Sequence, residues 1–188
     1  MTTGFRKLAR VCLPASLRRW WRLRFGWQWF RGDYVSWPEA RAASGGYDDV
    51  AVLARVVAAG AKFAGEALTF HVSLDEAVAA GGAQTILLSS VLPYLEAPVT
   101  LLEDIVRRGF KHVIIDRTPF VSRGRTRLAM QHTPPELGGG SYPCWLCNEN
   151  ELLAPLHACY RLVRLWPALD DLAGNVRHRG IHFQRKAQ

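Results

Sequence analysis

Three short apolar runs, separated by helical segments, constrain the fold of this chain more than any other feature. In residues 68–72, Leu, Phe and Val alternate with Thr and His, a period of two that predicts a strand. Residues 85–88 and 112–115 are continuous apolar runs, typical of strands that are buried on both faces. Helices are predicted between them, over 73–80 and 94–108. This alternation is typical of a parallel sheet with right-handed crossovers, so we expect an α/β fold with a mostly parallel sheet.

The remaining segments extend this pattern on both sides. A helix is predicted over 48–62, with Val and Leu on one face. Residues 117–143 are rich in Arg, Pro and Gly, and their length predicts a functional lid or an irregular segment. A helix over 148–157 and strands over 160–165 and 180–185 complete the chain. We therefore expect an α/β domain over residues 48–188.

The positive charge of the chain is concentrated in an amino-terminal extension, residues 1–47. The net charge is +8, and eight basic residues but no acid precede Asp33. Tryptophan and phenylalanine are interspersed with these cations, a mixture that favours association with an anionic membrane surface. Packing against the chain's own domain or a partner is an alternative, whereas no nucleic-acid signature accompanies the charge, so we expect no specific nucleic acid.

Two features of the apolar segments predict where in the cell the protein is located. No run of 18 or more uncharged apolar residues occurs, which argues against a membrane-spanning helix. Arginine and lysine interrupt the amino-terminal segment, which therefore does not resemble a signal peptide. We expect a cytoplasmic protein that associates peripherally with the inner face of the membrane.

Four cysteines are too few for a disulfide scaffold in a chain of 188 residues, so we expect reduced thiols. Cys144 and Cys147, with His157 and Cys159 downstream, have residue types that bind zinc. His157 and Cys159 are only one residue apart, however, and would point in divergent directions. We therefore expect no metal site.

Three segments fall where ligands bind in a parallel sheet, at the carboxyl ends of strands. The first contains Ser89 and Ser90, which alternatively cap the next helix. The second contains Asp116 and Arg117, an acid and a base that alternatively pair within the fold. The third runs from Ser141 to Trp145, and its aromatic side chains alternatively serve packing.

These segments resemble the successive motifs of a bacterial family of S-adenosylmethionine-dependent methyltransferases, often associated with surface-polysaccharide gene clusters. The motifs read Leu-Leu-Ser-Ser-Val-Leu-Pro-Tyr-Leu at 87–95, Val-Ile-Ile-Asp-Arg-Thr-Pro-Phe at 113–120 and Ser-Tyr-Pro-Cys-Trp at 141–145. Residues 32–37 and 44–48 resemble the amino-terminal segment of the same family. The resemblance thus extends from about residue 27 to the end of the chain.

The resemblance implies a Rossmann-like class I methyltransferase sheet with an antiparallel last strand. It also implies an internal deletion near residue 57, where the family has a strand, a glycine-rich turn and a second strand that ends in an acid. The glycine cluster at 138–140 follows no predicted strand and does not replace that turn. We therefore expect an incomplete Rossmann-like sheet with an exposed apolar edge, which a homo-oligomer could cover.

The resemblance assigns roles to the residues of the three motifs. The cofactor would be S-adenosylmethionine, in contact with Ser89, Ser90 and Tyr94. Asp116 and Arg117 would be catalytic and face an unknown acceptor. The acceptor would further contact Thr118, Tyr142 and Trp145. The alternative hypothesis is an inactive remnant that acts as a binding or membrane-associated interaction module, because most polar contacts to the nucleoside are lost with the deleted segment.

Overall fold

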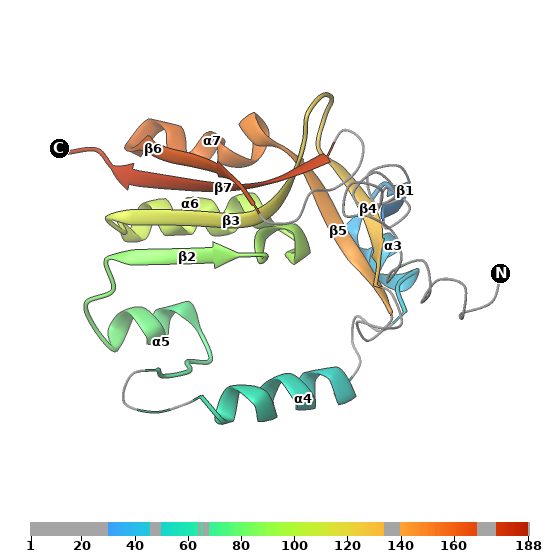
Figure 1. Cartoon of the computed structure of the whole chain (residues 1–188), viewed down its shortest axis with the longest axis horizontal. Helices are drawn as coiled ribbons and strands as arrows, with labels where there is room; N and C mark the ends of the chain where they lie inside the picture. The colour runs from blue at the N-terminus through green and yellow to red at the C-terminus, as the bar shows by residue number, and fades with distance from the viewer. Residues whose placement is uncertain are drawn as a thin grey trace, which may run out of the picture.

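A seven-stranded mixed sheet with helices forms the body of the protein (Figure 1). The computed structural model describes residues 30–45, 50–63, 65, 68–133, 140–168 and 176–187. The strands are β1 (Phe30–Tyr34), β2 (Thr85–Ser89), β3 (His112–Val121), β4 (Arg127–His132), β5 (Ser141–Asn148), β6 (Tyr160–Pro167) and β7 (Val176–Arg185). The helices are α3 (Trp37–Ala42), α4 (Val50–Ala61), α5 (Leu74–Ala79), the 3₁₀ helix η2 (Leu92–Tyr94), α6 (Pro98–Arg108) and α7 (Glu149–Cys159).

Strand β3 is the centre of the sheet and has a different neighbour at each end. Along one edge it pairs with β7 in antiparallel orientation, as predicted for the last strand. Along the other edge, β2 pairs in parallel with its first half, from Thr85 opposite His112 to Ser89 opposite Asp116. Strand β5 pairs in parallel with only the last two residues of β3. The predicted parallel pairing of β2 and β3 is therefore confirmed. Strands β3 and β5 come together only beyond the end of β2.

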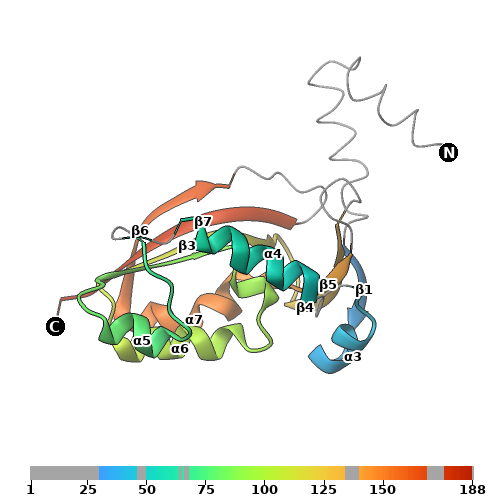
Figure 2. The same cartoon turned by 90° about the horizontal axis from the view of Figure 1, so that it is seen from below.

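Helices α6 and α7 cover one face of the sheet around β3, as Figure 2 shows. Helix α7 begins where the Asn148 side chain accepts hydrogen bonds from the backbone N–H groups of Asn150 and Glu151. Helix α6 ends at Gly109, whose φ of 76° is accessible to glycine without steric cost. The main core contains apolar side chains from these helices and from β2, β3 and β7: Leu88, Leu102, Ile105, Val113, Ile115, Leu152, Leu156, Ile181 and Phe183.

A second, smaller core lies at the β1 end of the sheet. Trp37 and Ala40 of α3 pack there against Leu128 and Met130 of β4. Strand β1 pairs with β4 in antiparallel orientation. Residues 30–45 belong to the expected amino-terminal extension. They contribute strand β1 to the sheet, and helix α3 packs against β4.

The predicted strand over 68–72 is wrong. Only an isolated bridge between Gly65 and Leu68 forms there. Leu68, Phe70 and Val72 are 46%, 61% and 94% exposed. A strand needs a partner for its backbone groups, and within the described residues no strand lies beside this segment, so the alternation of side chains alone does not produce one.

The expected predominance of parallel pairs is also wrong. The sheet has two parallel pairs, β2–β3 and β3–β5, and four antiparallel pairs, β1–β4, β4–β5, β3–β7 and β6–β7. The physical reason lies in the connections, because β4 and β5 pair directly, as do β6 and β7, and neither connection contains a described helix.

The region 117–143 is not the predicted loop. Strand β3 continues to Val121, β4 spans Arg127–His132, and β5 begins at Ser141. Only residues 134–139 of this region, which include Gly138 and Gly139 of the glycine cluster, lie outside the described residues. The region therefore supplies one end of the sheet.

The predicted helices over 48–62, 94–108 and 148–157 correspond to α4, α6 and α7. Helix α5 begins as predicted, with the Ser73 side chain accepting a hydrogen bond from the Glu76 backbone N–H at 3.2 Å. Figure 1 shows α4 set apart from the sheet, beyond α5. None of the described helices is long and apolar enough to cross a membrane.

Candidate functional site

Ser89 and Asp116 lie together where β2 ends beside the middle of β3. They are opposite each other in the parallel ladder, and the Ser89 hydroxyl donates a hydrogen bond of 3.4 Å to Oδ2 of Asp116. Arg117 Nε lies 4.0 Å from the same oxygen. The Asp116 side chain is 26% exposed and that of Arg117 is 44% exposed. The structure thus brings together an acid, a base and a hydroxyl that solvent can reach.

The backbone at this place adopts an unusual conformation. Ser90 has a φ of 54° and Arg117 has a φ of 52°, and within the described residues they are the only non-glycine residues with positive φ. The Ser90 N–H donates a hydrogen bond of 3.0 Å to the Asp116 carbonyl. The ladder between β3 and β7 is irregular between Ile115 and Thr118. An irregularity of this kind redirects the side chains that follow, and it is frequent near binding sites.

The third motif contacts the first through aromatic side chains. Tyr94 of η2 packs edge-to-face on Tyr142 of β5, with ring centroids 5.4 Å apart. The Trp145 indole N–H donates a hydrogen bond of 3.0 Å to the Leu95 carbonyl. The Tyr94 hydroxyl donates to Oε1 of Gln131 at 2.9 Å. These contacts hold η2 against β5, so all three motifs of the family resemblance meet in one region.

Tyr142 and Trp145 also have clear packing partners. The Tyr142 hydroxyl accepts a hydrogen bond of 3.0 Å from Thr133, and Trp145 stacks on Trp37 with ring centroids 6.1 Å apart. Trp145 packs against both cores. These contacts favour the alternative in which the two aromatic residues serve packing.

The alternative in which Ser89 and Ser90 cap a helix is wrong. Val91 is the N-cap residue of η2 and Ala97 that of α6, and neither position has a side-chain capping hydrogen bond. The serine hydroxyls therefore serve no capping function, and that of Ser89 is directed to Asp116 instead.

Thr118, the third predicted residue of the second motif, is completely buried. Its hydroxyl has no hydrogen-bond partner in the described part of the chain. It lies on β3 between the residues that pair with β2 and those that pair with β5. An acceptor could reach this hydroxyl only if the structure around it moved.

Cys144 and Cys147 are buried free thiols on β5. Burial raises the pKa of Cys147 to about 12, with a smaller contribution from the charge of Glu151. Burial and then the neighbouring Cys147 raise the pKa of Cys144 as well. Zinc binds the thiolate, which these surroundings disfavour. The described residues contain no cluster of three or more residues able to hold a metal ion.

The described residues do not fit the nucleoside half of S-adenosylmethionine. The edge of β2 opposite β3 carries no strand within the described residues. A glycine-rich turn and a strand ending in an acid would be needed there to hold the ribose. The segment that precedes β2 consists instead of α4, an isolated bridge and α5. What is present at the carboxyl end of β2 is the group formed by Ser89, Asp116 and Arg117.

Comparisons with models of protein families, with curated proteins and with solved structures find no match for this chain.

Proposed function

We propose that this chain is a member of the S-adenosylmethionine-dependent methyltransferase family that its motifs resemble, and that it transfers a methyl group to an acceptor in surface-polysaccharide biosynthesis. One observation carries the proposal. The three motifs span 58 positions, from Leu87 to Trp145, and are in contact in the fold: the first pairs with the second along β2 and β3, and contacts the third around η2. Motifs that form one site must lie close together in the fold. Motifs that serve only for packing could equally lie far apart.

In this proposal the acceptor lies over the carboxyl end of β2. An oxygen of the Asp116 carboxylate accepts the proton of the acceptor's nucleophilic group. Ser89 fixes the orientation of that carboxylate through its hydrogen bond. Arg117 attracts a polar or anionic part of the acceptor. S-adenosylmethionine supplies the methyl group, and the resemblance assigns Ser89, Ser90 and Tyr94 to its contact surface.

A second candidate function is an inactive binding module derived from this family. The observation that favours it is the free edge of β2, because the part of the fold that would hold the nucleoside does not lie there within the described residues. Most of the affinity of the cofactor would then be lost. The two candidates predict opposite results in a binding measurement.

The measurement is isothermal titration of the complete chain with S-adenosylhomocysteine at up to millimolar concentration. The methyltransferase proposal predicts saturable binding that Ser89→Leu weakens about tenfold, since loss of a hydrogen bond and added volume each cost on the order of 1 kcal/mol. Thr85→Leu is the matched control, because Thr85 is exposed at the other end of the same strand. Absence of binding in the unmodified protein would favour the binding module.

A further inference from the structure

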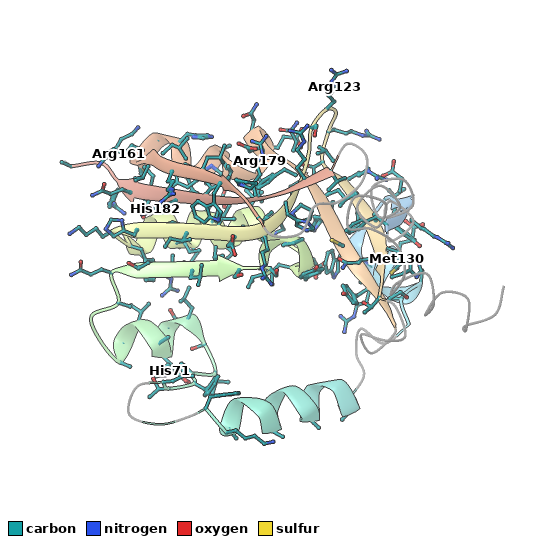
Figure 3. The ribbon with its side chains drawn as sticks, viewed as in Figure 1. His71, Arg123, Met130, Arg161, Arg179 and His182 are labelled. Carbon is teal, nitrogen blue, oxygen red and sulfur yellow. The ribbon has the colours of Figure 1, made fainter. Side chains whose placement is uncertain are left out.

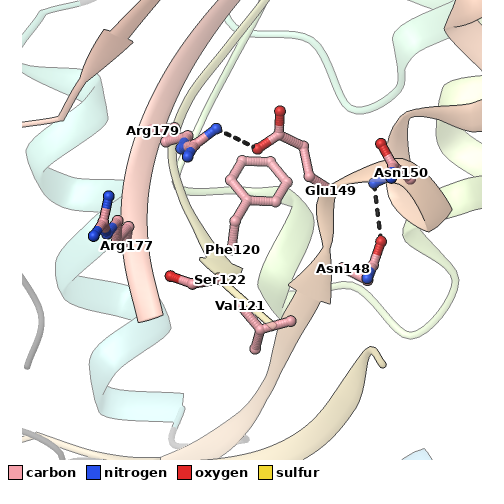
Figure 4. A pocket seen from close by; sticks show the side chains of 8 residues that line it. All are labelled: Phe120, Val121, Ser122, Asn148, Glu149, Asn150, Arg177 and Arg179. Atoms are coloured by element: carbon pink, nitrogen blue, oxygen red, sulfur yellow. Dashed lines mark hydrogen bonds and ion pairs between the residues drawn. The ribbon is translucent and has the colours of Figure 1, made fainter. Parts of the chain in front are cut away.

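A separate cavity lies at the carboxyl end of β3, where β3 and β5 end side by side and α7 begins (Figure 4). Its volume is about 230 Å³. Phe120, which pairs with Cys147, is four positions beyond Asp116 along β3, so the cavity is distinct from the group at the end of β2. The carboxyl ends of adjacent parallel strands are the usual location of ligands in α/β proteins.

The lining of this cavity is mainly polar and comes from three segments of the chain: residues 120–122, 148–150 and 177–179. Figure 4 shows the Phe120 ring between two arginines of β7 and the residues at the start of α7. The polar lining residues are Ser122, Asn148, Glu149, Asn150, Arg177 and Arg179.

The two arginines differ in their surroundings. Nη1 of Arg179 lies 2.7 Å from Oε2 of Glu149, and each of the two side chains is 33% exposed. Arg177 is exposed, and in the described part of the chain it has no ion-pair partner. Arg179 uses one of its five N–H donors in this pair, so donors remain on both guanidinium groups.

The charges of the lining select the charge of the ligand. Two guanidinium groups and one carboxylate leave a single positive charge. A singly charged anion neutralises it, whereas the second charge of a doubly charged anion would remain uncompensated beside Glu149. A carboxylate matches the planar geometry of a guanidinium group, with which it can form two parallel hydrogen bonds.

The neutral residues select hydroxyl groups. The Asn148 side chain is already engaged, since its oxygen accepts from the first turn of α7 and its Nδ2 donates to the Gly124 carbonyl at 2.7 Å. Within the described part of the chain, the Ser122 hydroxyl and the Asn150 side-chain amide are not engaged in this way, and both residues line the cavity. Each can both donate and accept, as a hydroxyl-bearing ligand requires.

We propose that this cavity binds a small hydroxylated monocarboxylate, such as a sugar acid. Arg177 and Arg179 hold the carboxylate, and Ser122 and Asn150 hold the hydroxyl groups. The cavity is smaller than the 300–1,000 Å³ that is usual for larger ligands, which fits a compact molecule of this kind. The proposal is independent of the proposed methyl transfer, because no residue is shared between the two sites.

The test is isothermal titration of the full chain with gluconate as the probe. Saturable binding of gluconate is expected, with sorbitol, which keeps the hydroxyls without the charge, binding at least tenfold more weakly. Acetate, which keeps the charge without the hydroxyls, is likewise expected to bind more weakly than gluconate. Arg177→Gln is expected to weaken gluconate binding about tenfold or more, since it removes a charge-assisted hydrogen bond.

Arg31→Gln is the matched control, because it removes one exposed arginine on β1. This variant is expected to bind gluconate with the same affinity as the unmodified protein. Ser122→Ala gives a second test that leaves the charge unchanged, and it is expected to weaken gluconate but not acetate. No gluconate binding, equal affinity in Arg177→Gln and Arg31→Gln, or tighter binding of inorganic phosphate than of gluconate would each overturn the proposal. Titration with S-adenosylhomocysteine, which does not involve this cavity, separates its failure from that of the proposed methyltransferase.

Discussion

At the scale of single residues, the backbone of Ser90 and Arg117 is the feature that sequence patterns do not indicate. A non-glycine residue held in a sparsely populated conformation costs on the order of 1–3 kcal/mol. Both residues lie beside the hydrogen bond between Ser89 and Asp116. Such a cost persists where neighbouring contacts fix the backbone, and here the ladder between β2 and β3 does so on one side of the site. This supports a functional interpretation of the end of β2.

A second residue-scale feature is a pair of histidines, His112 on β3 and His182 on β7. Figure 3 labels His182 and the nearby Arg161 of β6. Nδ1 of His112 lies 3.0 Å from Nε2 of His182. Burial lowers the pKa of His182, and the positive charges of His112 and Arg161 lower it further. The folded protein therefore binds fewer protons than the unfolded chain as the pH falls through the ordinary pKa of histidine.

The free energy of unfolding is consequently expected to fall as the pH decreases from 7.5 to 5.5, within the range where an unperturbed histidine of pKa ~6.5 gains its proton. His182→Asn is expected to reduce this dependence, because the neutral side chain does not titrate. Urea unfolding at the two pH values measures the effect, with His71→Asn as the control for an exposed histidine. An equal pH dependence in both variants would contradict the prediction.

At the scale of secondary-structure elements, the sequence correctly predicted those strands whose hydrophobic pattern is matched by a partner strand in the fold. Continuous apolar runs correctly predicted β2 and the first half of β3, which pair with each other and contribute to the main core. The expected burial of both faces is wrong for β2, since Leu88 is buried but Leu87 is 60% exposed. The alternation at 68–72 satisfied the same local rule but found no partner strand. Periodicity describes which side chains share a face, whereas the strand itself depends on backbone hydrogen bonds made elsewhere in the chain.

The missed strand β4 shows the opposite case. Its apolar run is only Leu128, Ala129 and Met130, and polar residues surround it, so the sequence predicted a loop. These three side chains are buried because β1 and β5 flank β4 and α3 packs on it. The proximity of Ser89 and Asp116 was predicted correctly, because both residues follow apolar runs that were correctly assigned to neighbouring strands.

Close packing between β6 and β7 gives a prediction at this scale. Gly180 lies opposite Trp166 in the ladder, and a Cβ atom at Gly180 would overlap the Trp166 indole. Gly180→Ala is therefore expected to lower the free energy of unfolding by about 1–3 kcal/mol. Chemical denaturation measures it, and Gly65→Ala is the control because a Cβ there meets no atom within 4 Å.

Gly180 and Trp166 also provide a test of whether the indole ring causes this destabilisation. In a protein that already carries Trp166→Ala, the added methyl group has space, so Gly180→Ala is expected to cost much less than in the unmodified protein. Equal costs in the two backgrounds would show that the ring is not the obstacle.

At the scale of the whole molecule, the uneven charge leads to a prediction for the amino-terminal segment, whose residues 1–29 lie outside the described part. We expect it to bring the protein reversibly to anionic membranes, since each arginine or lysine near such a surface contributes about 1 kcal/mol. Flotation with vesicles containing phosphatidylserine is expected to recover more protein than flotation with neutral vesicles. Replacing Arg18 and Arg19 by Gln should reduce recovery, whereas Arg123→Gln with Arg125→Gln, an equal change elsewhere, should not. Equal recovery with both kinds of vesicle would exclude the electrostatic mechanism.

The free edge of β2 leads to a prediction about association. The strand reads Thr-Ile-Leu-Leu-Ser and contains neither a charge nor a proline, the residues that usually prevent edge strands from pairing. Leu87 at its centre is 60% exposed. Two copies related by a two-fold axis through Leu87 would place Thr85 opposite Ser89 and Ile86 opposite Leu88. The edge is thus complementary to itself, and we expect the chain to form dimers through β2.

Sedimentation velocity at increasing protein concentration measures this association. Leu87→Lys is expected to shift the equilibrium to the monomer, because pairing would bring two ammonium groups close together at the centre of the interface. Val35→Lys adds the same charge at a residue that is 94% exposed and lies outside β2, so it is expected to leave the dimer intact. A dimer that resists Leu87→Lys would show that another surface holds the two copies together, and a monomer at every concentration would show that the chain covers this edge by itself.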